Sequence, residues 1–352
     1  MNKISGQMKK PFYKRKGFLW TIGILILLLA GVAISFKVSP WPGALVIRAD
    51  FEMNDTKNEQ ALKKHVADKD ITVMSDQSYR QNDNDAKLDV YFAPSIKPDQ
   101  KLPTVIWTHG GAWLSGDKDD QAPYYKLLAS MGVTVISLDY SLAPGKTYPT
   151  AVNQINDAYK YIQDNASKFR ADTNKIILAG DSAGAQLSAQ LAAIITNPAY
   201  AKEVGVTPNL KPAQLRGVIL YCGIYKMEGL TYPNPDLPKI IGWGDDVAMW
   251  AYTGMRHPSD SLIRQMSPYY HVTKDFPPAY ISGGNADPLT DGQSKPLADE
   301  LQGLKVDVTT EFYAADHEPK LPHEYQFNLD NDDGKKALQT AFTFIEKHVQ
   351  GN

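Results

Sequence analysis

Residues 175–184, Lys-Ile-Ile-Leu-Ala-Gly-Asp-Ser-Ala-Gly, join an apolar run to a turn bounded by glycines, and this stretch decides the fold. The apolar run at 175–179 predicts a buried strand, and apolar residues at helical spacing over 187–195 predict a helix after the turn. The turn at 180–184 matches the G-x-S-x-G pattern, which holds a serine Oγ clear of the sheet edge. Ser182 is therefore the candidate nucleophile. A serine that only caps the helix is the simpler alternative.

Strands and helices alternate on both sides of this segment. Further short apolar runs predict strands at 87–92, 104–107, 133–138, 218–222, 279–282 and 306–312. Helical spacing predicts helices over 123–131, 152–162 and 338–349. This alternation predicts an α/β fold with a mostly parallel sheet and helices on both faces. Residues 224–270 contain aromatics and prolines without a strand pattern, so we expect them to form a cap insertion over the sheet.

A second motif, His-Gly-Gly-Ala-Trp at 109–113, directly follows the predicted strand 104–107. Backbone N–H groups held by a glycine turn can point at the negative charge that develops on a carbonyl oxygen during acyl transfer. The residue after the nucleophile supplies a further N–H. A plain turn would use Gly-Gly equally well, but the pairing with the serine motif favours an oxyanion hole. Its expected members are Gly110, Gly111, Ala112 and Ala183.

These motifs resemble the hormone-sensitive-lipase-like branch of the α/β-hydrolases, which includes many bacterial carboxylesterases. That branch carries His-Gly-Gly-Gly, whereas Ala112 stands at the fourth position here. Gly-Asp-Lys at 116–118 and Asp-Tyr-Ser-Leu-Ala-Pro at 139–144 also resemble family segments, with Ser141 where arginine is more usual. The resemblance spans about 88–349. It implies an α/β-hydrolase fold, activity on acyl esters, and neither a metal nor an organic cofactor.

The acid of a catalytic triad should follow a strand late in the chain, because in this fold the order is serine, acid, histidine. Asp-Pro-Leu at 287–289 follows the predicted strand 279–282 and resembles a family signature, so Asp287 is the expected acid. Asp291, one turn further on, is the second candidate. A cap on the following helix explains Asp291 better than catalysis does.

The base should lie in the loop after the last predicted strand, 306–312. His317 is the histidine nearest to the end of that strand, so we expect it to take the proton from the nucleophile. The family usually has histidine, any residue and then phenylalanine, whereas Glu318 and Pro319 follow His317. This departure leaves His323 as the alternative base.

The N-terminal part of the chain contains 19 residues without a charge, at 18–36. As a helix they would span about 28 Å, close to the thickness of the hydrocarbon layer of a bilayer. Only Lys37 follows closely, whereas six basic residues precede the stretch, so the positive-inside rule places the N-terminus in the cytoplasm and the body outside. These six are Lys3, Lys9, Lys10, Lys14, Arg15 and Lys16. A secretory signal peptide cleaved near 31–33, which would release the protein, is the alternative.

These features predict four regions. Residues 1–17 form a basic cytoplasmic tail, 18–36 a single-pass transmembrane anchor, and 37–70 a polar, weakly helical linker and entry region that leads into the hydrolase domain at 71–352. The net charge of −2 leaves −8 for the chain after the six basic residues, which argues against a nucleic-acid partner. Cys222 is the single cysteine, so no internal disulfide can form.

A metal site is not expected. Asp-Asn-Asp-Asp-Gly at 330–334 resembles a calcium loop, but its glycine falls one place early for an EF-hand. We expect these residues to cap the last helix instead. The sequence predicts two partners. One is the membrane, which residues 18–36 would cross, and the other is a small acyl ester that lies outside the cytoplasm. An amidase or peptidase with the same triad and an inactive surface-displayed binding module are the alternatives, and the sequence makes no prediction of the oligomeric state.

Overall fold

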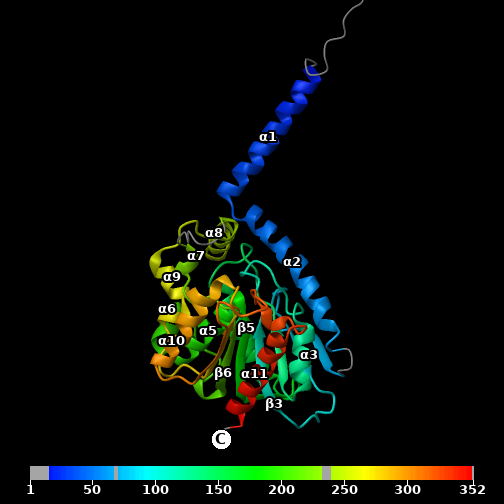
Figure 1. The fold of residues 1–352 in the computed structure, drawn as a ribbon, viewed down its shortest axis with the longest axis vertical. Coiled ribbons are helices and arrows are strands. Elements are labelled where there is room, and N and C mark those ends of the chain that lie inside the picture. The colour runs from blue at the N-terminus through cyan, green and yellow to red at the C-terminus, as the bar shows by residue number, and fades with distance from the viewer. Residues whose placement is uncertain (1–15, 67–69, 232–238, 351–352) are drawn as a thin grey trace, which may run out of the picture.

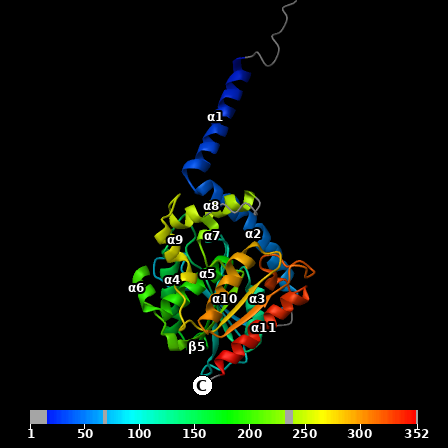
Figure 2. The same cartoon turned by 60° about the vertical axis from the view of Figure 1, so that its left-hand side comes forward.

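A computed structural model describes residues 16–66, 70–231 and 239–350, and Figures 1 and 2 show its arrangement. The body is built on one eight-stranded sheet with the strand order β1-β2-β4-β3-β5-β6-β7-β8. The strands are β1 Thr72–Ser78, β2 Lys87–Phe92, β3 Leu102–Thr108, β4 Thr134–Leu138, β5 Ala171–Asp181, β6 Leu215–Tyr221, β7 Ala279–Gly283 and β8 Val308–Phe312. The longer helices are α1 Lys16–Val38, α2 Trp41–Lys63, α3 Ala122–Ser130, α4 Thr150–Asp164, α5 Ser182–Thr196, α8 Lys239–Thr253, α10 Lys295–Gly303 and α11 Asp332–Val349. The short ones are α6 Pro198–Val204, η2 Pro212–Gln214, α7 Glu228–Thr231, α9 Asp260–Met266, η3 Pro268–Tyr270, η4 Thr290–Ser294 and η5 Tyr325–Phe327.

The sheet is parallel from β4 through β3, β5, β6 and β7 to β8. At one edge of the sheet, β2 runs antiparallel to both of its neighbours, β1 and β4. The carboxyl ends of the parallel strands therefore meet at one edge of the sheet, where ligands bind in open α/β sheets. The predicted mostly parallel sheet is confirmed.

Both faces of the sheet are covered by helices. Successive side chains of a strand point to opposite faces, so a strand that is apolar throughout needs helices on both sides to bury it. Val105 and Trp107 of β3 pack with α3 and α11 on one face. Ile106 and Leu178 pack on the other face, where α4, α5 and α10 contribute most of the apolar contacts. This two-sided burial explains why the parallel strands read as continuous apolar runs rather than as alternating ones.

The segment between β6 and β7 corresponds to the expected cap. Its described residues form helices α7, α8 and α9 and contain no strand. Tyr232, one of the aromatic residues of this region, lies outside the described residues. Figures 1 and 2 both place α8 above the sheet and beside the first turns of α2.

Helix α2 lies within the expected polar, weakly helical linker at 37–70, where Trp41–Lys63 form one continuous helix of 23 residues. Arg48 fastens this helix to the body by donating a hydrogen bond of 2.8 Å from Nε to the carbonyl of Leu114. Near its start, Gly43 packs so closely on α8 that a Cβ there would lie 2.9 Å from Val247. Contacts with the rest of the body, rather than a strong apolar pattern of its own, therefore hold α2 in place.

Helix α1 projects away from the body in both views (Figures 1 and 2). Its segment Gly17–Val38 has a mean hydropathy of 2.5 and none of it is buried, so its length and composition would allow it to cross a membrane. A signal sequence would pass the same test. This helix coincides with the uncharged stretch at 18–36. The basic residues at 3–15 lie outside the described residues.

The turn between β5 and α5 requires its glycines because the end of β3 lies against it. A Cβ at Gly184 would lie 2.0 Å from the carbonyl oxygen of Thr108. A Cβ at Gly180 would lie 2.5 Å from the backbone carbon of Gly184. Neither neighbour is a flexible side chain, so a methyl group could be accommodated only by moving the backbone.

We therefore predict that Gly184→Ala lowers the free energy of unfolding by about 2 kcal/mol or more, because the added methyl group overlaps backbone atoms of β3. Gly303→Ala is the matched control. A Cβ at Gly303, at the end of α10, has no atom within 4 Å. This control should change stability by no more than about 0.5 kcal/mol. Thermal unfolding of the two full-length variants measures the difference, and equal melting temperatures would contradict the packing described here.

Candidate active site

Ser182 lies at the turn where β5 ends and α5 begins, as the serine motif predicted. Its φ of 49° lies in the left-handed region, which is uncommon for a residue other than glycine and indicates a strained turn. The first turn of α5 lies directly behind it, and the side chain is nearly buried at the carboxyl edge of the sheet. The turn therefore holds the hydroxyl group in one place instead of leaving it free to rotate in solvent.

Two polar side chains from distant parts of the chain are aligned with Ser182. His323 Nε2 lies 3.0 Å from Ser182 Oγ, and His323 Nδ1 lies 3.0 Å from Asp287 Oδ1. Asp287 is buried in the loop after β7, and its Oδ1 also accepts a hydrogen bond of 3.0 Å from the backbone N–H of Leu289. Serine, imidazole and carboxylate thus form a continuous hydrogen-bonded line, with the geometry of a nucleophile, a base and an orienting acid.

The structure contradicts the placement of His317 beside Ser182. His317 Nε2 lies 2.9 Å from Asp333 Oδ2, near the start of α11, and its ring packs against Tyr313. The expectation failed because distance along the chain from the end of β8 is a poor guide in a long loop. Asn285, in the β7 loop, holds this loop by donating to the carbonyl of His317 at 2.9 Å and accepting from the N–H of Leu321 at 2.9 Å.

A signal for His323 was present in the sequence. His323 is followed by Glu324 and then Tyr325, so an aromatic residue stands two places after the histidine, as in the histidine, any residue, phenylalanine pattern. Tyrosine in place of phenylalanine concealed the match. Asp291, the second candidate acid, is exposed and forms an ion pair of 2.6 Å with Lys295, so it takes no part in this arrangement.

The glycine loop after β3 lies beside Ser182. Gly110 and Gly111 line the same cavity as Ser182 and His323. Gly111 has a φ of 89°, and a Cβ there would lie 2.2 Å from the carbonyl oxygen of Ser115, so this position requires glycine. Ala112 also has a positive φ, 52°, and packs partly buried against the core. Of the four residues expected in the oxyanion hole, the structure thus places the two glycines at the cavity wall.

Tyr140 fixes the conformation of this glycine loop. Its hydroxyl lies 3.1 Å from the carbonyl oxygens of both His109 and Gly110, to which it donates. Its ring also stacks on the ring of His109, with centroids 4.3 Å apart. Burial lowers the pKa of His109 to about 4, so this imidazole is neutral and does not act as a cation in the site.

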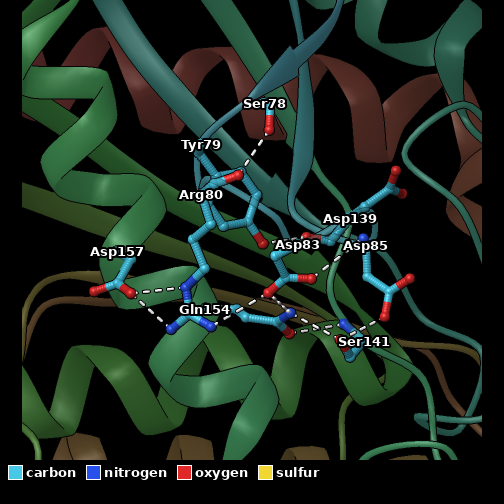
Figure 3. Close-up of polar contacts among 9 residues, drawn as sticks. All are labelled: Ser78, Tyr79, Arg80, Asp83, Asp85, Asp139, Ser141, Gln154 and Asp157. Carbon is cyan, nitrogen blue, oxygen red and sulfur yellow. Dashed lines mark hydrogen bonds and ion pairs between the residues drawn. The ribbon is translucent and has the colours of Figure 1, made fainter.

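The segment that carries Tyr140 is held by the polar network in Figure 3. Ser141 Oγ donates to Asp85 Oδ2 at 2.7 Å, and the Ser141 N–H donates to Gln154 Oε1 at 2.8 Å. Gln154 in turn donates to Asp83 at 2.9 Å, and Arg80 bridges Asp83 and Asp157. Ser141, where the family more often has arginine, is thus linked through Gln154 and Asp83 to Arg80.

The cavity in front of Ser182 has a volume of about 210 Å³. Its walls come from the glycine loop, the serine turn, the histidine loop and helix α2, which contributes Phe51 and Asn58. Asp181 also lines it, with Oδ1 accepting a hydrogen bond of 2.7 Å from Trp107 Nε1. Helix α2 is thus part of the wall of the site.

The charge state of His323 depends on its acidic neighbours. Burial lowers the pKa of His323, but the negative charges of Asp287, Glu324 and Asp181 and the hydrogen bond to Asp287 outweigh burial and raise it to about 9. The acids thus stabilise the imidazolium form. The fraction of neutral imidazole, the form that can accept the serine proton, increases as the pH rises toward that value.

One group of described side chains has the composition of a metal site: the ligand atoms of Cys222, Asp287 and His323 lie within 4.8 Å of one another. Both ring nitrogens of His323 already face Ser182 and Asp287. Burial raises the pKa of the Cys222 thiol well above its usual value, which disfavours the thiolate that a metal requires. The arrangement therefore fits a hydrogen-bonded triad better than a metal site.

At 330–334, the expected cap is present, since the Asn331 side chain accepts from the N–H of Asp333 at the start of α11.

Comparison with known proteins agrees with this geometry. The model of the BD-FAE family matches residues 88–301. The esterase LipC of Mycobacterium tuberculosis is 29% identical over 201 residues, which cover 57% of this chain and 48% of LipC. An acetyl esterase of Salmonella choleraesuis is 28% identical over 254 residues, covering 69% of this chain and 71% of that protein. The chain thus spans about half the length of LipC and about two thirds of the acetyl esterase.

Solved structures support the fold. Esterase B from Lactobacillus rhamnosis superposes with a TM-score of 0.70 at 24% identity, over 87% of this chain and 96% of that one. An esterase from Pyrobaculum calidifontis superposes with a TM-score of 0.66 at 21% identity, over 86% of this chain and 92% of that one. Both the sheet order and the position of the serine turn fit such a fold. The chain belongs to the BD-FAE family and has the α/β-hydrolase fold of the hormone-sensitive-lipase-like carboxylesterases.

Proposed function

We propose that this protein is a serine carboxylesterase in which Ser182, His323 and Asp287 form the catalytic triad. The observation that carries the proposal is the pair of 3.0 Å contacts that His323 makes, through Nε2 to Ser182 Oγ and through Nδ1 to Asp287 Oδ1. A histidine bonded on both sides in this way has one tautomer available, with the proton on Nδ1 and the lone pair of Nε2 facing the serine.

The proposed reaction proceeds in two halves. Ser182 Oγ attacks the carbonyl carbon of the ester while its proton moves to His323 Nε2. The tetrahedral intermediate collapses to an acyl-serine, and His323 returns the proton to the departing alcohol oxygen. Water then attacks the acyl-serine by the same proton route and releases the carboxylic acid. Asp287 remains ionised throughout and stabilises the imidazolium that forms in each half.

The negative charge on the carbonyl oxygen requires a set of donors. We propose the backbone N–H groups of Gly110, Gly111, Ala112 and Ala183 for this role. The glycine loop supports this role because the Tyr140 hydroxyl binds the carbonyl oxygens of His109 and Gly110 and so keeps them turned away from the oxyanion. Donors fixed in advance need no reorganisation when charge develops, and a single one typically contributes about 3 kcal/mol to transition-state stabilisation.

The substrate is proposed to be a short or otherwise small acyl ester. The cavity of about 210 Å³ is smaller than the roughly 300–1,000 Å³ typical of sites for drug-sized ligands, which favours a small acyl group. The acetyl esterase relative supports the same size class. A complete serine, histidine and carboxylate line opposes the alternative of an inactive binding module.

We predict that His323→Ala lowers kcat for p-nitrophenyl acetate by at least about a thousandfold, because it removes the imidazole that lies 3.0 Å from Ser182 Oγ and would accept the serine proton. His317→Ala is the matched control on the same loop and should retain activity within about tenfold. Steady-state kinetics on both variants, with circular dichroism to verify folding, measures the difference. Strong loss in His317→Ala together with activity in His323→Ala would contradict the proposed triad.

We further propose that α1 anchors the protein as a single-pass membrane helix, with the N-terminus in the cytoplasm and the hydrolase outside. Two features support this: the uncharged helix Gly17–Val38 and the basic residues that precede it in the sequence. Moving those charges across the bilayer would be more costly than moving the body, which a secretion pathway can translocate. The ester would then lie outside the cytoplasm.

Protease treatment of intact cells, after removal of any wall, should therefore degrade the body and leave a short N-terminal fragment protected. Antibodies against the two ends of the chain distinguish the products. Soluble protein in the medium whose sequence starts near residue 34 would instead support cleavage and secretion. Protection of the whole body would contradict the outward orientation.

A further inference from the structure

Glu324, the residue after the proposed base, directs a carboxylate into the catalytic cavity. It has a φ of 60°, in the left-handed region, and its N–H donates to Cys222 Sγ at 3.3 Å. With the backbone turned in this way, Glu324 Oε1 lies 3.7 Å from His323 Nε2, and the side chain is only 19% exposed. The carboxylate therefore faces the proposed base rather than bulk water.

The same carboxylate also borders the glycine loop. A Cβ built on Gly110 would lie 3.2 Å from Glu324 Oε1, so the carboxylate spans the space between the proposed base and the proposed oxyanion hole. Its charge is unfavourable for the oxyanion, because two negative charges at short range in a partly desolvated site repel each other. A cation brought in by the substrate would offset this repulsion.

Apart from His323, whose neutral form accepts the serine proton in the proposed reaction, the charged side chains of the rest of the cavity have the same sign. Asp120 and Asp181 contribute two more carboxylates to its wall. Among the described residues that line this cavity, none is lysine or arginine. The wall thus offers a field that attracts cations, and this field acts at the site of reaction rather than on a distant surface.

The position of Glu324 indicates which part of the substrate carries the charge. In the proposed reaction His323 Nε2 returns a proton to the alcohol oxygen, so the alcohol must lie within hydrogen-bond reach of that nitrogen. The Glu324 carboxylate lies 3.7 Å from the same atom. It is therefore adjacent to the alcohol side of the ester, whereas the acyl carbon is bonded to Ser182.

We infer that Glu324 is a specificity-determining residue that binds a cationic group, an ammonium or a quaternary ammonium, on the alcohol part of the ester. This inference rests on the proposed esterase function and narrows its substrate class. A contact of this kind between a partly buried carboxylate and a cation is expected to favour the charged ester by about tenfold.

Two esters of the same acid and nearly the same shape test the inference. Acetylcholine carries a quaternary ammonium, and 3,3-dimethylbutyl acetate replaces it with a neutral tert-butyl group. For the full-length protein at low salt we expect kcat/KM to be about tenfold higher for acetylcholine, and the preference should decline with added salt. Glu324→Gln should bring the ratio of the two kcat/KM values to within about twofold of one.

The measured quantity is the ratio of the kcat/KM values for the two esters. A loss of activity in Glu324→Gln that affects both esters equally therefore leaves this ratio unchanged. Glu318→Gln is the matched control: it makes the same change on the same loop, but Glu318 is 70% exposed and pairs with Lys320 instead of facing the cavity. This control should keep the wild-type ratio. If wild type hydrolyses both esters equally, or if Glu324→Gln keeps the preference, the inference is wrong while the esterase function stands. If wild type hydrolyses p-nitrophenyl acetate but neither of these two esters, the inference is wrong while the esterase function stands. If it hydrolyses none of the three, the esterase function fails and the inference fails with it.

Discussion

The close packing of the serine turn against the end of β3 is the constraint on which the rest of the site depends. The backbone of Gly184 lies so near Thr108 that no side chain fits between them. This contact places the first turn of α5 against the strand that leads into the glycine loop. The proposed nucleophile and the proposed oxyanion donors are therefore brought together by backbone packing of two adjacent strands, before any side chain contributes.

The remaining parts of the site are added by longer loops, each held by its own contacts. Tyr140 fixes the glycine loop, and the polar network through Ser141 and Gln154 fixes the segment that carries Tyr140. Asn285 fixes the path of the histidine loop, so that His323 rather than His317 lies over Ser182. Each of these supporting residues contacts a loop that carries groups expected to touch the substrate. Such support is expected where small displacements of those groups cost much activity.

The parts of this structure that the sequence predicted are those determined by local pattern. The parallel strands are buried on both faces, so their apolar runs were readable, and the serine turn was readable from its two glycines. The sequence indicated only weak helical character for the region of α2, because contacts such as that of Arg48 with the carbonyl of Leu114 hold its full length in place. His323 carried a local signal, Tyr325 two places after it, but His317 was preferred because it is nearer to the end of β8. The loop between β8 and α11 follows a path set by a side chain from the β7 loop, and no local pattern encodes that contact.

We propose that His323 makes Ser182 Oγ reactive, and covalent labelling is the direct test. A fluorophosphonate probe reacts with an activated serine, and mass spectrometry of the digested protein locates the adduct. We predict one adduct, on the peptide that contains Ser182, with labelling nearly abolished in His323→Ala and retained in His317→Ala. An adduct on another serine, or undiminished labelling of Ser182 in His323→Ala, would contradict it.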